Sequence, residues 1–301
     1  MSEHTMRAVT VGEFGGPEVL TVGRVARPVP LPTEVLVRVH AAGINPVDWK
    51  TRAGQGMAGL QTLPLILGWD VSGVVEEVGF GVTTLAPGDE VYAMPWFPRP
   101  AGGYAEYVTA PSRQFARKPA SIGHAEAAAL PLAVLTAWQA LVDTAGIRAG
   151  QRVLVHAAAG GVGHLAVQIA RHLGADRTVD YTRQRFEDEA GEVDVVIDLM
   201  GGTDATDVRS VAVTRPGGLI VSVPGGVSPA LAEAAGAAGV RTSPVLVEPD
   251  GAALTTLAGL VDAGAVRVEV ERVFALEDVA EAHRRGETNR TRGKLVLDLA
   301  P

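Results

Sequence analysis

The stretch VLVHAAAGGVGHLAVQIARHLGADRTVDY, residues 153–181, contains the pattern that decides the fold. An apolar run leads into a cluster of small residues, and apolar side chains then recur at helical spacing at Leu165, Ile169 and Leu173. A strand, a glycine-rich turn and a helix in this order suit a phosphate group, because small residues let the backbone approach it and the helix N-terminus offers free N–H groups. A purely structural tight turn is the alternative. The pattern predicts dinucleotide contacts from Ala158, Gly160, Gly161, Val162 and Gly163.

Apolar runs alternate with helical patterns after residue 151. The runs typical of buried strands are residues 152–157, 193–200, 218–223 and 243–247, and the helical candidates lie near 164–173, 203–213, 228–238 and 251–263. Such alternation predicts a parallel sheet with helices on both faces. Ligands bind beyond the carboxyl ends of the strands in such sheets, so Gly201, Pro224 and Gly225 are further candidate cofactor contacts.

The rest of the chain has a different texture. From Met6 to about Ala120, short alternating runs are cut by Gly and Pro, which predicts an irregular β domain. Residues 123–146 are rich in Ala and Leu at helical spacing, and Pro131 is expected to divide them into two helices. The last predicted strand, Lys294 to Leu299, is expected to rejoin the first domain. The predicted boundaries are 1–122 for the first domain, 123–267 for the nucleotide-binding domain, and 268–301 for the return.

Composition excludes several classes of function. The 301 residues are 47% hydrophobic with a net charge of −8, so no basic surface for nucleic acid is implied. No window of membrane-spanning length is free of Gly, Pro and charge, and residues 1–7 lack a secretory pattern, so we expect a cytoplasmic protein. The absence of cysteine excludes disulfides, thiolate catalysis and cysteine-based zinc sites.

Four segments occur in an order typical of one family: AAGINPVDWKTRAG (41–54), LGWDVSGVVEEVGFGVTTLAPGDEVYA (67–93), HAAAGGVGHLAVQIARHLGA (156–175) and NRTRGKLVLDL (289–299). Together they resemble the medium-chain dehydrogenase/reductase superfamily, specifically its zinc-independent quinone oxidoreductase branch. The resemblance runs nearly end to end. It implies a GroES-like catalytic domain interrupted by a doubly wound Rossmann domain, NADPH as cofactor, hydride transfer to quinones or α,β-unsaturated carbonyls, and a homodimer.

The resemblance also suggests catalytic residues. Negative charge develops on the acceptor oxygen during hydride transfer, and hydrogen-bond donors aimed at that oxygen are what the protein adds. The resemblance puts Asn45 at the active site with a suitable amide, Lys50 can place a positive charge there, and Thr136 matches a threonine near the nicotinamide. Each has a structural alternative: a turn residue before a proline, a solvated lysine, and a threonine bonded to its own helix.

Arg292 and Lys294 also have both a functional and a structural interpretation. Arg292 and Lys294 match a segment that closes over the cofactor in relatives, and a solvated charged turn is their alternative. Without cysteine, the cysteine-based zinc sites of relatives cannot form in this chain. We therefore interpret His40, His156, His164 and His172 as packing or surface residues.

One part of the family pattern is missing. After Ala175 a further strand and helix are expected, whereas RTVDY follows at once, so the Rossmann domain is predicted to lack one strand-helix unit. By counting, Asp180 lies at the distance of an acidic residue that binds ribose hydroxyls and favours NAD. By alignment, Tyr181 matches a tyrosine near the 2′-phosphate of NADPH, and Arg185 can meet that phosphate. We favour the alignment and therefore NADPH.

The leading prediction is an NADPH-dependent reductase of quinones or enones. The missing strand-helix unit motivates two alternatives to it. One alternative is a non-catalytic nucleotide-binding or structural protein, and another is an enzyme that has lost hydride transfer.

Overall fold

The computed structural model describes residues 5–175, 186–201 and 205–300. The contacts between Cα atoms divide the chain into two compact units. The first unit comprises Met1–Leu135, Glu248–Gly264 and Val268–Pro301, and the second comprises Thr136–Val247 and Ala265–Arg267. The predicted domain boundaries at residues 122 and 267 stay a prediction.

The first unit is built on two sheets, in which every strand pairing except that of β13 with β14 is antiparallel. The larger has the order β13-β14-β3-β5-β6-β8, with β7 also paired to β3, and the smaller has the order β2-β1-β4. The strands are β1 (Thr5–Val11), β2 (Leu20–Ala26), β3 (Glu34–Ile44), β4 (Leu65–Ile66), β5 (Asp70–Val78), β6 (Glu90–Ala93), β7 (Tyr107–Pro111), β8 (Phe115–Arg117), β13 (Val270–Ala275) and β14 (Lys294–Asp298). Val35, Val37 and Val39 of β3 are buried in the apolar core of this unit. The predicted irregular β domain is confirmed.

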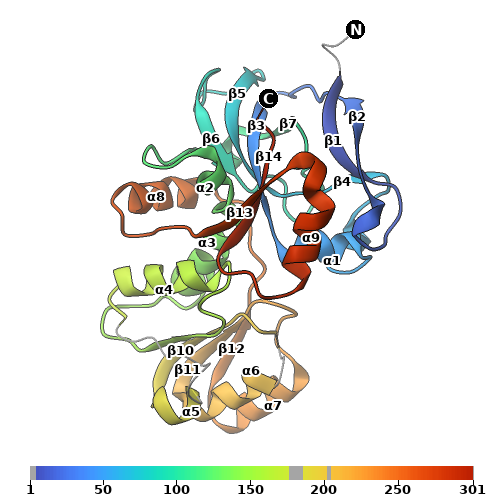
Figure 1. Ribbon diagram of the computed structural model, residues 1–301. Helices are drawn as coiled ribbons and strands as arrows, with labels where there is room; N and C mark the ends of the chain where they lie inside the picture. The colour runs from blue at the N-terminus through green and yellow to red at the C-terminus, as the bar shows by residue number, and fades with distance from the viewer. Residues whose placement is uncertain (1–4, 176–185, 202–204, 301) are drawn as a thin grey trace. The chain divides into compact units, whose positions relative to one another are not determined.

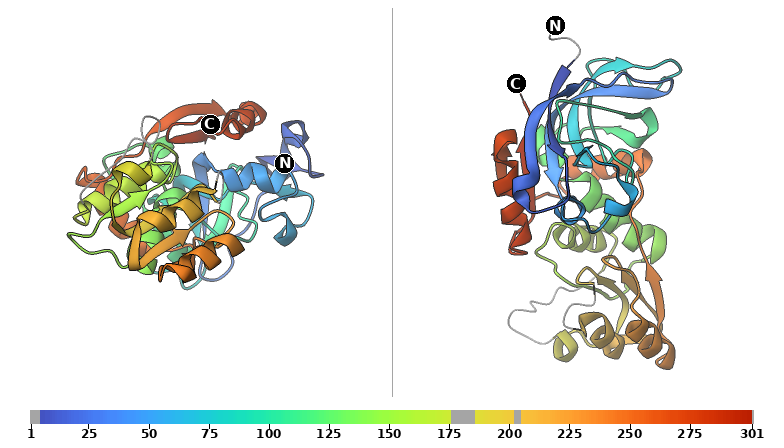
Figure 2. Two further views of the ribbon diagram at one scale, coloured as in Figure 1. Left: turned by 90° about the horizontal axis from the view of Figure 1, so that it is seen from below. Right: turned by 90° about the vertical axis from the view of Figure 1, so that its right-hand side faces the viewer.

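The first unit also contains helices and short helical turns. They are α1 (Pro46–Arg52), α2 (His124–Ala128), α8 (Gly251–Asp262), α9 (Val279–Glu287) and the short turns η1 (Pro17–Val19), η2 (Ala58–Leu60), η3 (Ser112–Gln114) and η7 (Leu276–Asp278). Helix α3 (Pro131–Trp138) begins in this unit, so Pro131 starts a new helix as predicted. Helix α9 packs against α1 and η1 (Figure 2). Gly286 makes this approach possible, because a Cβ there would lie 2.5 Å from the Trp49 ring.

The last strand rejoins the beginning of the chain. Strand β14 is antiparallel to β3, with Leu295 opposite Ile44 and Leu297 opposite Ala42. The prediction that residues 294–299 return to the first domain is confirmed.

The second unit contains the predicted parallel sheet. Its order is β12-β11-β10-β9, and all three pairings are parallel. The elements are η4 (Gln139–Thr144), β9 (Val153–Val155), α4 (Gly163–His172), α5 (Phe186–Glu189), β10 (Val193–Asp198), α6 (Thr206–Ser210), η6 (Val211–Val213), β11 (Thr214–Ser222), α7 (Pro229–Ala237) and β12 (Arg241–Pro244). Figure 1 shows α4 on one side of the sheet and α5, α6 and α7 on the other. Leu154, Val196 and Ile220 of the sheet form a core cluster with Leu231 of α7.

The missing strand-helix unit stays a prediction. Strand β9 pairs with β10 and with no other strand in the described parts of the chain, which is what loss of its other neighbour would leave. Residues 176–185, where the sequence departs from the family pattern, lie outside the described residues.

A membrane-crossing helix is not found in the described ranges: none of their helices is long and apolar enough to span a bilayer.

We expect Gly43 to be required for the fold of the first unit. A Cβ at Gly43 would lie 2.3 Å from the Ala128 carbonyl oxygen and 2.9 Å from Asp70 Cβ, so Gly43→Ala must push α2 away from the sheet. The expected cost is about 2 kcal/mol of unfolding free energy, measured by urea denaturation. Gly23→Ala in β2 is the matched control, because no atom lies within 4 Å of its Cβ position. Equal loss in both variants would contradict the packing argument.

Candidate functional site

The junction between β3 and α1 fixes Asn45. Asn45 has an extended backbone (φ −130°, ψ 157°), and Pro46 follows at the first helical position, where its fixed φ suits a helix start. The Asp48 carboxylate oxygen Oδ2 accepts a hydrogen bond from the Asn45 backbone N–H at 2.6 Å. This is one half of a capping box, and the sequence Asn-Pro-Val-Asp therefore positions the Asn45 side chain.

Around Asn45 the first unit buries a polar cluster. The Asn45 Nδ2 donates to Asp70 Oδ2 at 2.8 Å, and its Oδ1 accepts from the Lys294 ammonium group. The Lys294 Nζ also donates to the Ile44 carbonyl at 3.1 Å and lies 3.7 Å from Asp70 Oδ2. The other Asp70 oxygen accepts the Leu132 N–H at 2.7 Å. None of Asn45, Asp70 and Lys294 is more than 3% exposed, so these side chains interact in a space without bulk water.

Burial shifts the charges of this cluster. Loss of hydration raises the pKa of Asp48 to about 7 and that of Asp70 to about 6, despite the opposing attraction of Lys294. Burial also lowers the pKa of Lys294, although both carboxyl groups oppose that shift. Two carboxyl groups thus share one ammonium group. At neutral pH the cluster lies close to a change of net charge, which is typical of functional sites and also of structural ion pairs.

Tyr104 extends the cluster on the side of Asp48. Its ring is fully buried, and burial together with the Asp48 charge raises its pKa. The Tyr104 hydroxyl lies close enough to stabilise the Asp48 carboxylate, but neither this hydroxyl nor Asp48 Oδ1 has a well-formed hydrogen bond within the described residues. Their interaction is therefore weaker than that of the Asn45 backbone with Asp48 Oδ2.

A second buried group connects α1 to α9. Arg52, 2% exposed, pairs with Glu287, and its Nη1 donates to His283 Nδ1 at 3.2 Å. Because arginine only donates, His283 Nδ1 must accept, and the neutral ring carries its proton on Nε2. Burial, with the Arg52 charge, lowers the pKa of His283 to about 3. The ring edge contacts Tyr104, with centroids 5.9 Å apart.

In the second unit, the glycine loop joins β9 to α4. A Cβ on Gly163 would lie 2.1 Å from the Ala157 carbonyl oxygen, so only glycine allows the helix to begin this close to the strand. Ala157 has a positive φ of 51°, and His164 Nδ1 donates to the Gly160 carbonyl at 2.9 Å. Among the described residues, no side-chain hydrogen bond caps the α4 N-terminus at Val162. The loop can therefore offer backbone N–H groups and a positive helix end to an anion.

Two further loops meet at the same edge of that sheet, because β9, β10 and β11 are parallel. A Cβ on Gly201, which has φ +67°, would lie 2.8 Å from the Pro224 carbonyl oxygen. Asp198 and Ser222, the last residues of β10 and β11, are opposite each other in register. Both are buried, and Asp198 Oδ2 and Ser222 Oγ have no hydrogen-bond partner in the described parts of the chain. Burial raises the pKa of Asp198.

The structure brings together only some of the predicted residues. Asn45 and Lys294 are in contact in the first unit, and Ala158, Gly160, Gly161, Val162, Gly163, Gly201, Pro224 and Gly225 line one sheet edge in the second. Lys50 is exposed on α1 and Thr136 is buried in α3. Arg292 is exposed, and its backbone N–H donates to Glu271. Asp180, Tyr181 and Arg185 lie outside the described residues.

Three members of the buried groups were not predicted from the sequence. Asp70 interrupts a run of buried strand residues, and a charged residue in such a run is a usable signal. Arg52 and His283 are 231 positions apart, and no local pattern indicates that they meet. Of the histidines interpreted as packing residues, His156 is buried and bonded to Ser210 Oγ at 2.8 Å, and burial lowers its pKa to about 4.

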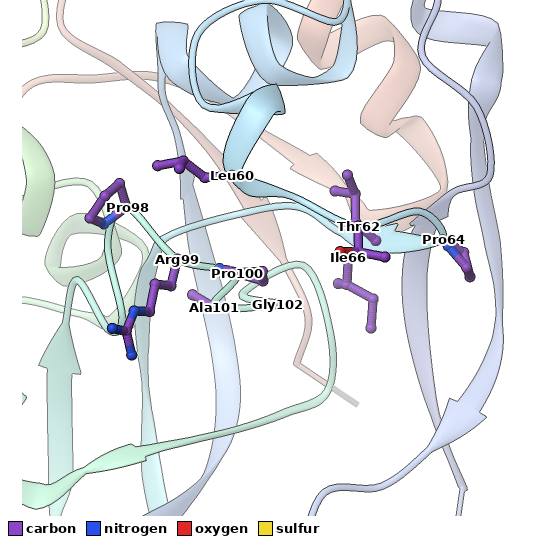
Figure 3. Close-up of a pocket in the computed structure, with 10 residues that line it drawn as sticks. Leu60, Thr62, Pro64, Ile66, Pro98, Arg99, Pro100, Ala101 and Gly102 are labelled. Atoms are coloured by element: carbon purple, nitrogen blue, oxygen red, sulfur yellow. The ribbon is translucent and has the colours of Figure 1, made fainter.

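The described residues contain no group of three or more His, Asp or Glu side chains placed to hold a metal ion. The first unit also contains a surface pocket of about 820 Å³ between two loops, held together by the Gln61 amide bonded to the Pro98 carbonyl. Its lining is Leu60, Thr62, Pro64, Leu65, Ile66, Pro98, Arg99, Pro100, Ala101 and Gly102. In Figure 3 the Arg99 side chain extends away from Pro64 and Ile66. The buried polar cluster does not line this pocket.

Two family descriptions match the chain. "Alcohol dehydrogenase GroES-like domain" matches residues 31–120, and "Zinc-binding dehydrogenase" matches residues 173–297. The second description names zinc, whereas this chain contains no cysteine.

Similar proteins cover almost the whole chain. A 2-methylene-furan-3-one reductase of Solanum lycopersicum is 35% identical, with 98% of this chain and 80% of that protein aligned. An NADPH-dependent alkenal/one oxidoreductase of Arabidopsis thaliana is 36% identical, with 97% and 79% aligned. The structure of the quinone oxidoreductase from Coxiella burnetii superimposes with a TM-score of 0.90 at 36% identity, covering 98% of this chain and 99% of that one. The Solanum alignment spans 326 positions, more than the 301 residues present here, so it opens gaps in this chain.

We expect Lys294→Met to destabilise the first unit strongly. The variant leaves two buried carboxyl groups without their ammonium partner, and breaking such a pair costs about 3 kcal/mol or more. Urea denaturation measures the loss. Lys50→Met is the matched control, because Lys50 is exposed and its substitution should change the unfolding free energy by less than about 0.5 kcal/mol. A wild-type midpoint for Lys294→Met would show that the buried ammonium group does not stabilise the fold.

Proposed function

The chain belongs to the medium-chain dehydrogenase/reductase superfamily, and we propose that it is an NADPH-dependent reductase that transfers a hydride to quinones and α,β-unsaturated carbonyl compounds. The observation that carries this proposal is the glycine loop of the second unit, where Gly163 lets an uncapped helix begin against the end of a parallel strand. The alignment of nearly the whole chain with reductases of this chemistry supports the same conclusion.

The residues of the second unit fit NADPH. Gly160, Gly161, Val162 and Gly163 would hold its pyrophosphate by backbone N–H groups, with Ala158 beside them. Gly201, Pro224 and Gly225 end the neighbouring strands and would contact the nicotinamide half. For the adenosine half we propose that Tyr181 and Arg185 meet the 2′-phosphate, against the repulsion of Asp180. When bound, NADPH supplies the hydride.

The first unit would supply the polar groups for the acceptor. Asn45 Nδ2 carries two N–H groups, of which Asp70 accepts one. The Lys294 ammonium group adds positive charge beside Asn45, and together they favour the negative charge that develops on the acceptor oxygen. We also propose that Thr136, in the second unit, contacts the nicotinamide, that Lys50 places a positive charge at the active site, and that Arg292 contacts the cofactor.

We also propose that the protein is a cytoplasmic homodimer that pairs through β12. This strand has β11 as its one partner among the described strands, and an unpaired edge presents free backbone groups. Sedimentation of the purified protein measures its oligomeric state directly.

The proposed function predicts that the protein oxidises NADPH when 1,4-benzoquinone or a simple enone is added, followed by the loss of NADPH absorbance. Gly163→Ala should raise the KM for NADPH by about tenfold or more, because the Cβ displaces the loop from the Ala157 carbonyl. Gly236→Ala in α7 is the control, since its Cβ position is open and far along the chain from the loop.

Two outcomes would contradict the proposal. A folded protein that does not bind NADPH in a fluorescence titration cannot be this reductase. Binding without turnover of any quinone or enone would instead favour a nucleotide-binding protein that does not transfer hydride.

A further inference from the structure

His156 is a buried histidine of the second unit that the proposed hydride transfer does not use. It follows the last residue of β9 and directly precedes Ala157, where the glycine loop begins. Successive side chains of a strand point to opposite faces, so His156 lies on the same face as Leu154, which belongs to the apolar core of this unit. His156 is 8% exposed. A polar ring in such surroundings is costly unless its hydrogen bonds are made.

Ser210 of α6 makes a hydrogen bond with His156, and the geometry fixes its direction. His156 Nε2 lies 2.8 Å from Ser210 Oγ, which in turn donates to the Thr206 carbonyl oxygen at 2.7 Å. The hydroxyl has one hydrogen and the carbonyl has none, so the imidazole must supply the hydrogen of its own contact. Burial lowers the pKa of His156 to about 4, so the ring is neutral and its one proton is on Nε2.

The His156 ring also packs edge-on against Phe186 of α5, with ring centroids 4.8 Å apart. Its backbone N–H donates to the Ile197 carbonyl of β10 at 3.1 Å. Strand β9 is three residues long, and β10 is its one partner among the described strands. The His156 side chain therefore gives the end of this short strand a second attachment, to α5 and α6.

Ala157, the next residue, has a backbone conformation that must be held. Its φ of 51° lies in the left-handed region, which a residue with a Cβ atom rarely adopts. Its carbonyl oxygen accepts the Gly160 N–H at 2.9 Å and lies where a Cβ on Gly163 would be only 2.1 Å away. A strained residue keeps such a conformation only where the surrounding structure fixes it. The position of Ala157 thus decides the shape of the loop.

We propose that His156 is a positioning residue for NADPH: its hydrogen bond to Ser210 ties the end of β9 to α6 and holds the glycine loop in the shape that offers backbone N–H groups to the pyrophosphate. This inference rests on the proposed function, in which that loop is the pyrophosphate site. His156 itself is directed into the core of the second unit, and it acts through the loop that follows it.

The first experiment measures the dissociation constant of NADPH by fluorescence titration. His156→Phe keeps a planar ring but removes the N–H donor, so binding should weaken about three- to tenfold. Ser210→Ala removes the acceptor and should weaken binding by a similar factor. Both substitutions break the same bond, so the double variant should bind no more weakly than the weaker single variant. His156→Gln, whose amide N–H can reach Ser210, should bind within about twofold of wild type.

Thr214→Val is the matched control. The Thr214 Oγ1 donates to the backbone carbonyl of the same Ser210 at 2.8 Å, and this bond is also buried. Thr214 is the first residue of β11, at the end of the parallel sheet opposite the glycine loop. Thr214→Val should therefore lower the stability of the second unit to urea but leave the dissociation constant of NADPH unchanged. This comparison separates positioning of the loop from a general loss of stability.

The second experiment measures the loop without NADPH, by hydrogen–deuterium exchange and mass spectrometry. His156→Phe should raise the exchange rate of residues 157–163 about threefold or more, because the loop opens more often when its attachment is lost. Exchange of α7 (Pro229–Ala237) should stay as in wild type. Thr214→Val should leave the exchange of residues 157–163 unchanged.

The outcomes separate the two levels of inference. Wild-type NADPH affinity in both His156→Phe and Ser210→Ala, equal weakening in Thr214→Val, or unchanged loop exchange in His156→Phe would each overturn the positioning role. If His156→Phe does not fold, Ser210→Ala serves for both experiments. If wild type does not bind NADPH, the proposed function fails, while faster loop exchange in His156→Phe would still identify His156 as the residue that holds the loop.

Discussion

The burial of Lys294 against Asn45 and Asp70 is the interaction on which the first unit depends. An ammonium group without bulk water must be compensated by hydrogen bonds and opposite charge, and the junction of β3, α1 and β5 offers both. Lys294 is the first residue of β14, which pairs antiparallel with β3, so its contacts help to hold the end of the chain against its beginning. The same contacts orient Asn45, so the groups that stabilise the fold are also those proposed to stabilise charge on the acceptor.

The two units contribute different kinds of polar group to the proposed reaction. The second unit creates an anion site from backbone alone: a parallel strand, a glycine that tolerates close approach, and an uncapped helix. The first unit contributes buried polar side chains. Burial raises the pKa of Asp48 and Asp70 and lowers that of Lys294, so it disfavours the charged form of all three. Hydride transfer to a quinone or an enone needs both properties, a held dinucleotide and a polar group for the reduced oxygen, and it does not require the cysteine zinc ligands that this chain lacks.

Local sequence patterns predicted the strands and helices well, because these follow from the spacing of apolar residues and from the positions of Gly and Pro. The glycine loop, the split of helices at Pro131 and the return of the last strand were all readable from residue order. The polar cluster was readable only in part: Asn45 and Lys294 stood in family motifs, but their contact spans 249 positions. Asp70, Arg52 and His283 were missed because their contacts form only in the folded chain. Burial there raises the pKa of Asp70 and lowers that of His283, and a local stretch of sequence does not indicate burial of this kind. Lys50 was the cation nearest Asn45 in sequence, whereas Lys294 is the cation that contacts it in space.

We propose that a hydride passes from NADPH to an electrophilic carbon of the substrate. NADPH carrying deuterium in both hydrogen positions at C4 of the nicotinamide, incubated with the protein and a simple enone, tests this transfer most directly. Mass spectrometry of the saturated ketone should show one deuterium at the β-carbon. Saturated product without deuterium, or NADPH consumed with no product, would contradict hydride transfer by this protein.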